Sequence, residues 1–297
     1  MGLVQGDLEL LIRLRREGYL PDAGTVAEIG AQQLSNSFLR ATSQINDLGS
    51  LYGKSSGYKA PHPLGSALSP KGYEPQHQSA PYAKPFWEWL GYRYLAIDID
   101  ESPDSLPLDL NFDEVPFHAV KQCHLVTNYG TTEHVANQCQ AFKIIHDLTA
   151  VRGVMVHHLP AQGMFNHGLV NYNPKFFWML SRSNNYKFLF MDFTHDPEQH
   201  ELPENVMHFV KQSDERNAER AKQYRFSDAA LMVAVQKVED IEFVPPIDVQ
   251  TGSTTNNDDL RRRYWTVFKS QPVERPSTIM QRLNAVYGKG DRKQAQS

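Results

Sequence analysis

Apolar runs and amphipathic segments alternate along the first 240 residues. Short apolar or alternating runs predict strands at residues 25–29, 92–100, 106–111, 123–130, 151–157, 186–193 and 229–238. Helical spacing of apolar residues predicts helices from Asp7 to about Glu17 and over residues 33–46, 86–90, 135–149 and 174–185. Strands separated by helices and short turns indicate an α/β fold with a doubly wound, mainly parallel seven-stranded sheet.

The first predicted strand and the turn after it, residues 25–34, read TVAEIGAQQL. Gly30 stands where the strand has to turn sharply into the next element, so Glu28 lies near the carboxyl end of the strand. In an open α/β sheet that end faces the ligand crevice, which places Glu28 to accept hydrogen bonds from a cofactor. A core strand whose glutamate caps the next helix explains the same residues, and both interpretations remain open.

Two segments interrupt this pattern. Residues 48–85 contain 17 Gly, Pro or Ser among 38 residues, too many for a regular element, and predict a lid over a site or a disordered insert. Residues 201–225 alternate in charge and predict a solvated helix face. We therefore expect an N-terminal helix (1–24), a main domain (25–240) that carries the insert 48–85, and a C-terminal extension (241–297).

Charge and cysteine content restrict the location and the partners. The formal net charge is −4, no apolar run has the ~18 residues of a membrane span, and the first residues match neither a secretory signal nor a transit peptide. Cys123 and Cys139 have no metal spacing. These features predict a cytoplasmic protein without a membrane segment.

The C-terminal extension is basic from residue 261. Three arginines at 261–263 precede Tyr264 and Trp265, which could contact RNA, although a helix that docks on the domain or on a second subunit explains them as well. Nucleic acid is not the expected partner. The extension is a candidate contact for a homo-oligomer.

Acids at the ends of the first three strands, a strand that closes in TNYGTTEH, and the late strands KFLFMDF and ALMVAVQKV together resemble a class I S-adenosylmethionine-dependent methyltransferase. The likeness is to the bacterial small-molecule type and covers about residues 20–240. It implies S-adenosylmethionine as cofactor and a small-molecule acceptor. The residues that match its cofactor site are Glu28 and Gly30 for the methionine part, Asp98 for the ribose hydroxyls, Asp109 and Leu110 for the adenine, and Asn128 and Tyr129 for the sulfonium.

The sequence departs from that family at the glycine loop. Ala31, Gln32, Gln33 and Leu34 follow Gly30 where further glycines are usual, which limits close approach of the main chain to a ligand. Gln32 either hydrogen-bonds the cofactor carboxylate or fills the site.

Methyl transfer to a hydroxyl or a cationic amine needs a base, and histidine is the usual one. His134, His157, His158 and His167 lie near predicted strand ends, and Glu133 could orient an imidazole. Strand alternation points His157 and His158 to opposite faces, so at most one of them reaches the crevice directly. Structural roles for these histidines remain open. Neither HxH nor HExxH spacing occurs, so no metal site is expected.

Two functions of different classes follow. The first is a methyltransferase that transfers a methyl group to oxygen or nitrogen of a small molecule, with residues 163–173 gripping a polar acceptor or forming an Asn-rich turn. The second is a catalytically inactive binding or scaffold protein with the same fold, favoured by the altered loop after Gly30. A nicotinamide-dependent oxidoreductase is a remote third, because GxGxxG is missing.

Overall fold

A seven-stranded sheet organises the main part of the chain. The computed structural model describes residues 2–60, 80–100, 102, 105–195, 228–249 and 255–268. Its strands are β1 (Gly24–Ile29), β2 (Tyr92–Asp98), β3 (Ser105–Pro107), β4 (Cys123–Tyr129), β5 (Thr149–Gln162), β6 (Lys187–His195) and β7 (Ala229–Gln236). They lie in the order β3-β2-β1-β4-β5-β7-β6, and the first five are parallel. β7 is antiparallel to both β5 and β6. The prediction of a mainly parallel sheet is confirmed.

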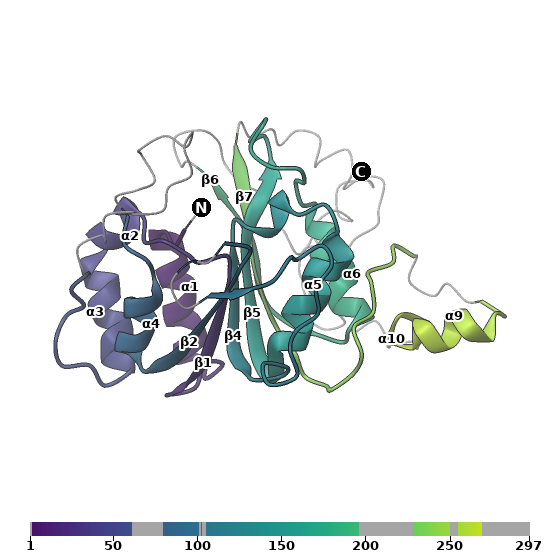
Figure 1. Ribbon diagram of the computed structural model, residues 1–297, viewed down its shortest axis with the longest axis horizontal. Helices are drawn as coiled ribbons and strands as arrows, with labels where there is room; N and C mark the ends of the chain where they lie inside the picture. The colour runs from purple at the N-terminus through teal and green to yellow at the C-terminus, as the bar shows by residue number, and fades with distance from the viewer. Residues whose placement is uncertain are drawn as a thin grey trace, which may run out of the picture. The chain divides into compact units, whose positions relative to one another are not determined.

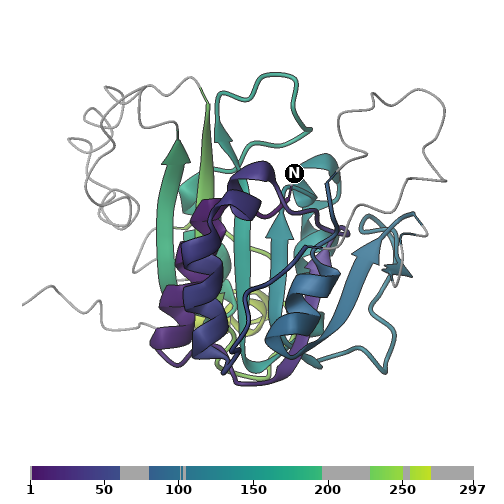
Figure 2. The same cartoon turned by 90° about the vertical axis from the view of Figure 1, so that its left-hand side faces the viewer.

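Helices cover both faces of this sheet (Figure 1). On one face lie α1 (Gln5–Arg16), α2 (Asn36–Arg40), α3 (Thr42–Leu51) and α4 (Lys84–Leu90), the layer turned toward the viewer in Figure 2. On the other lie α5 (Gln138–Leu148) and α6 (Pro174–Ser183). The sheet is therefore buried on both sides, which is why β7 reads as a nearly continuous apolar run and why β1 is buried along almost its whole length.

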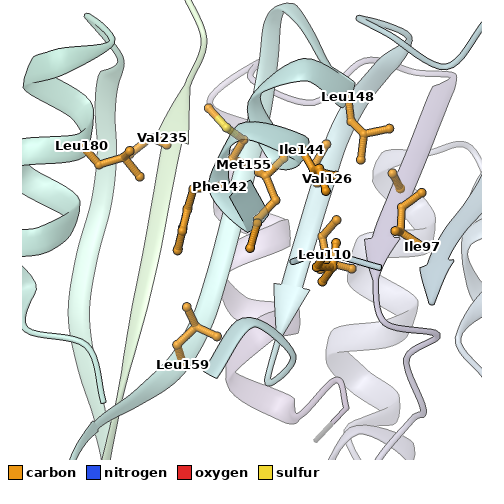
Figure 3. Close-up of a cluster of buried hydrophobic side chains, with 14 of the residues drawn as sticks. Ile97, Leu110, Val126, Phe142, Ile144, Leu148, Met155, Leu159, Leu180 and Val235 are labelled. Carbon is orange, nitrogen blue, oxygen red and sulfur yellow. The ribbon is translucent and has the colours of Figure 1, made fainter. Parts of the chain in front are cut away.

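Strand alternation divides the core into two clusters. Val26 and Leu125 point toward α1, whereas their neighbours Ala27 and Val126 point toward α5. Figure 3 shows part of the second cluster, in which side chains of α5 and α6 meet those of the sheet: Ile97, Leu110, Val126, Phe142, Ile144, Leu148, Met155, Leu159, Leu180 and Val235. These two clusters fix the positions of the strands and therefore of the strand ends.

The helix predicted over residues 33–46 is wrong in its start and its continuity, because residues 33–34 are extended and two helices, α2 and α3, follow. Gln33 forms an isolated antiparallel bridge with Tyr82, and Leu34 forms a parallel bridge with Leu3. Helix α2 begins only at Asn36, after the hydroxyl of Ser35 accepts a hydrogen bond from the Phe38 N–H. The helical spacing of apolar residues was real, but main-chain pairing with two distant segments keeps residues 33–34 extended.

Other boundaries also differ from the sequence-based expectation. β3 covers Ser105–Pro107 rather than 106–111, and β5 covers Thr149–Gln162 rather than 151–157. The helix predicted from residue 135 begins at Gln138, because the side chain of Asn137 caps it, and residues 132–134 form a short 3₁₀ helix, η2 (Thr132–His134). Residues 48–51 belong to α3 rather than to the insert, and residues 84–85 to α4. Residues 61–79 and 201–225, to which we assigned the lid and the charged helix, lie outside the described residues.

The chain divides into two compact units, Met1–Ile247 and Asp248–Ser297. Residues 241–247 belong with the sheet: His146 contacts the carbonyl of Ile241, and the Val244 N–H donates to Asn184 Oδ1. The second unit contains α9 (Asp258–Arg263) and α10 (Trp265–Phe268). In the part of the chain that the structure describes, no helix has the length and apolar character needed to cross a membrane.

Candidate functional site

The carboxyl ends of β1, β2, β4 and β5 lie along one edge of the sheet, because these strands are parallel. After β1 the chain turns at Gly30, whose φ of 76° favours glycine. Its N–H donates to the carbonyl of Ile97 over 2.7 Å. A Cβ at this position would overlap the hydroxyl of Thr131. The sharp turn expected at Gly30 is confirmed, and it brings the loop after β1 beside the end of β2.

Asp98 ends β2 at this edge and is half-buried. Its Oδ2 accepts the Ala31 N–H over 2.7 Å, and its Oδ1 accepts the Asp100 N–H over 3.4 Å. A carboxylate has about four acceptor positions, so capacity remains for the two hydroxyls of a ribose. The assignment of Asp98 to the ribose stays a prediction.

Glu28 is fully buried beneath the same turn. Its carboxylate accepts hydrogen bonds from the Gln32 N–H (2.8 Å), the Trp87 Nε1–H (2.6 Å) and the Tyr94 hydroxyl (2.7 Å). Burial raises the pKa of Glu28 to about 7 against the lowering effect of these three donors. In this conformation Glu28 supports the loop from below and offers no surface to a cofactor. It does not cap the next helix, because α2 begins at Asn36 with Ser35 as its cap.

Exchanging Glu28 for glutamine should alter the pH dependence of stability. The folded protein keeps a proton that the unfolded chain releases between pH 4.5 and about 7, so the wild type loses stability as pH rises through this window. The size of the effect is on the order of 3 kcal/mol. Urea unfolding of both proteins at pH 4.5 and at about pH 7 measures this effect. The free energy of unfolding of Glu28→Gln, relative to that of the wild type, should increase with pH. The same pH dependence in both proteins would contradict the assignment.

The N–H groups after Gly30 are occupied by the protein itself. Besides the Ala31 and Gln32 N–H groups, the Leu34 N–H donates to Pro81 O and the Ser35 N–H to Leu3 O, both near 3 Å. The Gln32 side chain is buried and donates from Nε2 to the Ile29 carbonyl over 2.8 Å. Its Oε1 has no hydrogen-bond partner among the described residues. Of the two roles considered for Gln32, filling the loop fits this geometry better.

Asp109 and Leu110 follow the short strand β3. The Oδ1 of Asp109 accepts both the main-chain N–H and the side-chain amide of Asn111, at 2.8 and 3.1 Å. Leu110 is buried in the cluster that faces α5. Asp109 therefore organises a turn, and its contact with adenine remains a prediction.

Asn128 and Tyr129 end β4 and are both buried. Asn128 Nδ2 donates to Thr132 Oγ1 over 2.8 Å and lies 3.3 Å from His157 Nδ1. The Tyr129 hydroxyl has no hydrogen-bond partner among the described residues, and burial, with Asp7 and Glu28 nearby, raises its pKa well above the ordinary value. In this conformation these residues can meet a ligand only through their main chain.

His157 and His158 point to opposite faces of β5, as the alternation predicts. His157 lies among aromatic rings, with centroid distances of 5.4 Å to Phe142 and 5.1 Å to Phe177. Burial lowers the pKa of His157 to about 3. A neutral, enclosed imidazole of this kind packs in the hydrophobic core and is a poor base for an acceptor at the sheet edge.

His158 lies on the face of α1. Its Nδ1 is 3.0 Å from Asp7 Oδ1, and its Nε2 is 2.7 Å from Thr194 Oγ1. Burial by itself would lower the pKa of His158, but the charge and hydrogen bond of Asp7, with the charge of Glu133, raise it overall. A carboxylate that holds one ring nitrogen leaves the other for proton transfer, an arrangement suited to a base. The sequence did not indicate this pair, because Asp7 is distant in the chain.

The sheet arrangement distinguishes this protein from other doubly wound folds. A parallel series β3-β2-β1-β4-β5 is extended by an antiparallel β7 that lies between β5 and β6. This arrangement is the doubly wound, mainly parallel seven-stranded sheet that the sequence resemblance implies.

Comparisons with known proteins find similarity in structure alone. No family model and no curated protein matches the sequence. A 1,6-didemethyltoxoflavin-N1-methyltransferase of Burkholderia thailandensis has 9% identity and a TM-score of 0.41, and 78% of each chain is covered. A putative methyltransferase of Bacillus halodurans has 10% identity and a TM-score of 0.40, with 78% of this chain and 99% of that chain covered. Similarities this distant carry no argument about ligand or reaction.

Two of the candidate bases belong to a separate cluster after β4. His134 Nε2 and His167 Nε2 lie 3.8 and 3.5 Å from Oε1 of the buried Glu133. Both imidazoles are exposed. The four histidines are thus divided among three surroundings. The suggestion that Glu133 orients an imidazole stays a prediction.

Exposed apolar side chains that the sequence analysis did not single out follow three strands. Ile99 follows β2, Phe112 follows β3, and Phe165 and Leu169 lie in the loop after β5. Single exposed apolar side chains are common on protein surfaces, so these residues do not by themselves indicate a ligand contact. Of the four, Ile99 alone directly follows a strand that ends in an acid, Asp98.

The basic run of the C-terminal unit is partly neutralised within its own helix. In α9, Arg261 pairs with Asp258 over 3.4 Å and Arg262 pairs with Asp259. The acids one turn earlier reduce the positive charge available to phosphates. A role of this unit in oligomerisation stays a prediction.

Proposed function

We propose that the protein is an S-adenosylmethionine-dependent methyltransferase that acts on a small molecule. The observation that carries this proposal is Asp98, which lies at the end of β2 beside the Gly30 turn with unused acceptor capacity. Asp98 lies at the carboxyl end of a parallel strand, and in open α/β folds ligands bind outside these strand ends, which supports the proposal.

The residues around Asp98 fit the nucleoside part of the cofactor. The carboxylate of Asp98 would accept hydrogen bonds from the two ribose hydroxyls, while Ile99 and Phe112 supply exposed apolar surface for a base. Asp109 is assigned to the adenine amino group. When bound, the cofactor supplies an electrophilic methyl group, and the protein aligns the acceptor with it.

His158 is the candidate base of this reaction. Asp7 holds its Nδ1, so Nε2, which now contacts the Thr194 hydroxyl, is the atom that would take a proton from an acceptor hydroxyl or amine. The loop over residues 163–173 supplies amides and the exposed Phe165 for contacts with the acceptor. Methylation at oxygen or nitrogen is compatible with this arrangement.

A second candidate is a catalytically inactive protein of the same fold that binds a partner or serves as a scaffold. It is favoured by the loop after Gly30, where the N–H groups of Ala31, Gln32, Leu34 and Ser35 are all occupied by the protein. A glycine loop normally offers such groups to a ligand. If this candidate holds, the methionine part of the cofactor finds no main-chain donors there.

Isothermal titration separates the two candidates. The full chain is titrated with S-adenosylmethionine, with S-adenosylhomocysteine and, as a control for dinucleotide binding, with NADH. We expect saturable binding of the first two and none of NADH. Absence of binding by well-folded protein would remove the methyltransferase proposal and favour the inactive binding protein.

A further inference from the structure

Glu133, His134 and His167 form a compact cluster at the end of β4. Glu133 and His134 lie in η2, and His167 comes from the loop after β5. One potential ligand atom from each residue lies within 4.8 Å of the other two. The expectation of no metal site rested on sequence-local spacings, which do not include this cluster. The third donor is 33 positions after His134 (167 minus 134) and reaches the cluster only through the fold.

The distances fit ligands of one ion. Donor atoms about 2.1 Å from a tetrahedral metal are about 3.4 Å from one another. His167 Nε2 and His134 Nε2 lie 3.5 and 3.8 Å from Glu133 Oε1, which is close to this value and too long for hydrogen bonds. Small side-chain rotations would suffice to bring all three donors onto one ion.

The carboxylate of Glu133 gives an independent reason to expect a ligand. It is completely buried, and neither Oε1 nor Oε2 has a hydrogen-bond partner among the described residues. A buried carboxylate without donors is costly, so such groups are usually paired or coordinate metals. Both histidines lie beyond hydrogen-bonding distance, so a cation between the three side chains would satisfy Glu133.

The loop that carries His167 is fastened to the same residue. The N–H groups of Leu169 and Val170 donate to the Glu133 carbonyl, at 2.8 and 3.1 Å. A Cβ on Gly168 would lie 2.9 Å from Glu133 Cγ, so glycine is needed for this approach. Asn166, immediately before His167, has a φ of 64°, in the left-handed region. The backbone is therefore shaped to hold His167 over Glu133.

We propose that Glu133, His134 and His167 bind one divalent transition-metal ion. Two imidazoles with one carboxylate favour Zn²⁺, Co²⁺ or Fe²⁺ over Mg²⁺ and Ca²⁺, which prefer oxygen donors. Three protein ligands leave at least one coordination position open, and the exposed imidazoles place it toward solvent.

The open position would take water or an oxygen atom of a bound molecule. A bound hydroxyl becomes more acidic on such an ion, as bound water does. This consequence rests on the proposed function. If the protein is a methyltransferase, the metal site implies an acceptor with a metal-binding hydroxyl and therefore an O-methylation.

The test uses untagged full-length protein that has been stripped with a chelator. Zn²⁺ and, in parallel, Mg²⁺ are titrated calorimetrically, and Co²⁺ binding is followed by its visible absorption. We expect one equivalent of Zn²⁺ or Co²⁺ to bind and Mg²⁺ to bind far more weakly. His134→Ala and His167→Ala should each weaken Zn²⁺ binding about 100-fold or more. Because both side chains are exposed, these variants should fold normally.

His118→Ala is the matched control, since His118 is an exposed histidine outside the cluster. It should bind Zn²⁺ like the wild type, and Glu133→Gln should behave like the two histidine variants. Absence of Zn²⁺ binding by the wild type, or equal binding by the His167→Ala variant, would overturn the proposal. The titrations contain no S-adenosylmethionine, so their outcome is independent of whether the protein is a methyltransferase.

Discussion

Replacing Asp98 by alanine is expected to lower the affinity for S-adenosylmethionine about 100-fold. The proposed contacts are two charge-assisted hydrogen bonds to the ribose, each worth roughly 1.5 to 3 kcal/mol. Loss of about 3 kcal/mol corresponds to a factor of about 100 in the dissociation constant. Isothermal titration of the folded variant measures this change directly.

Two further variants separate this contact from a change in the loop. Asp98 also accepts the Ala31 N–H, so its removal could shift the turn. Asp98→Asn keeps an acceptor for that N–H but lacks the charge, and its affinity should fall at least tenfold. Asp100→Ala removes an exposed acid two residues further on, which accepts the Ser102 N–H, and should bind almost normally. Wild-type affinity in folded Asp98→Ala would mean that the ribose lies elsewhere.

Replacing Asp7 by alanine is expected to destabilise the protein by about 3 to 5 kcal/mol near pH 6, the range for breaking a buried ion pair. Asp7 is fully buried and accepts hydrogen bonds from the Val4 N–H and from His158 Nδ1. The folded protein raises the pKa of His158 above its ordinary value of 6.5. The stability from this pair is therefore complete below pH 6.5 and decreases as pH rises through the folded pKa.

Urea unfolding of wild type and Asp7→Ala at several pH values tests this. The loss caused by the substitution should be larger near pH 6 than in alkaline solution. Glu9→Ala removes an exposed acid from the same helix and should change stability little at any pH. Combining Asp7→Ala with His158→Gln should cost less than the sum of the two single substitutions, because the residues act as a pair. Strict additivity would show that the pair contributes nothing.

Local sequence pattern determined the elements of this fold and several of their details. The apolar runs placed the seven strands, Gly30 marked the turn after β1, and alternation put His157 and His158 on opposite faces of β5. α6 begins at Pro174, as expected, with Asn173 as its cap. These features depend on residues within a few positions of one another, so chain periodicity and backbone preference suffice to predict them.

The chemistry of the site was decided by contacts between distant segments. Trp87 donates a hydrogen bond to Glu28, 59 positions earlier in the chain, and His158 contacts Asp7, 151 positions earlier. Neither partner could be inferred from sequence spacing. The pKa of Glu28 depends on burial, which exists only once α4 covers β1. Residues 33–34 are extended because Leu3 and Tyr82 pair with them. Glu133 and His167 meet because the loop after β5 folds back onto η2, and only tertiary packing can bring such groups together.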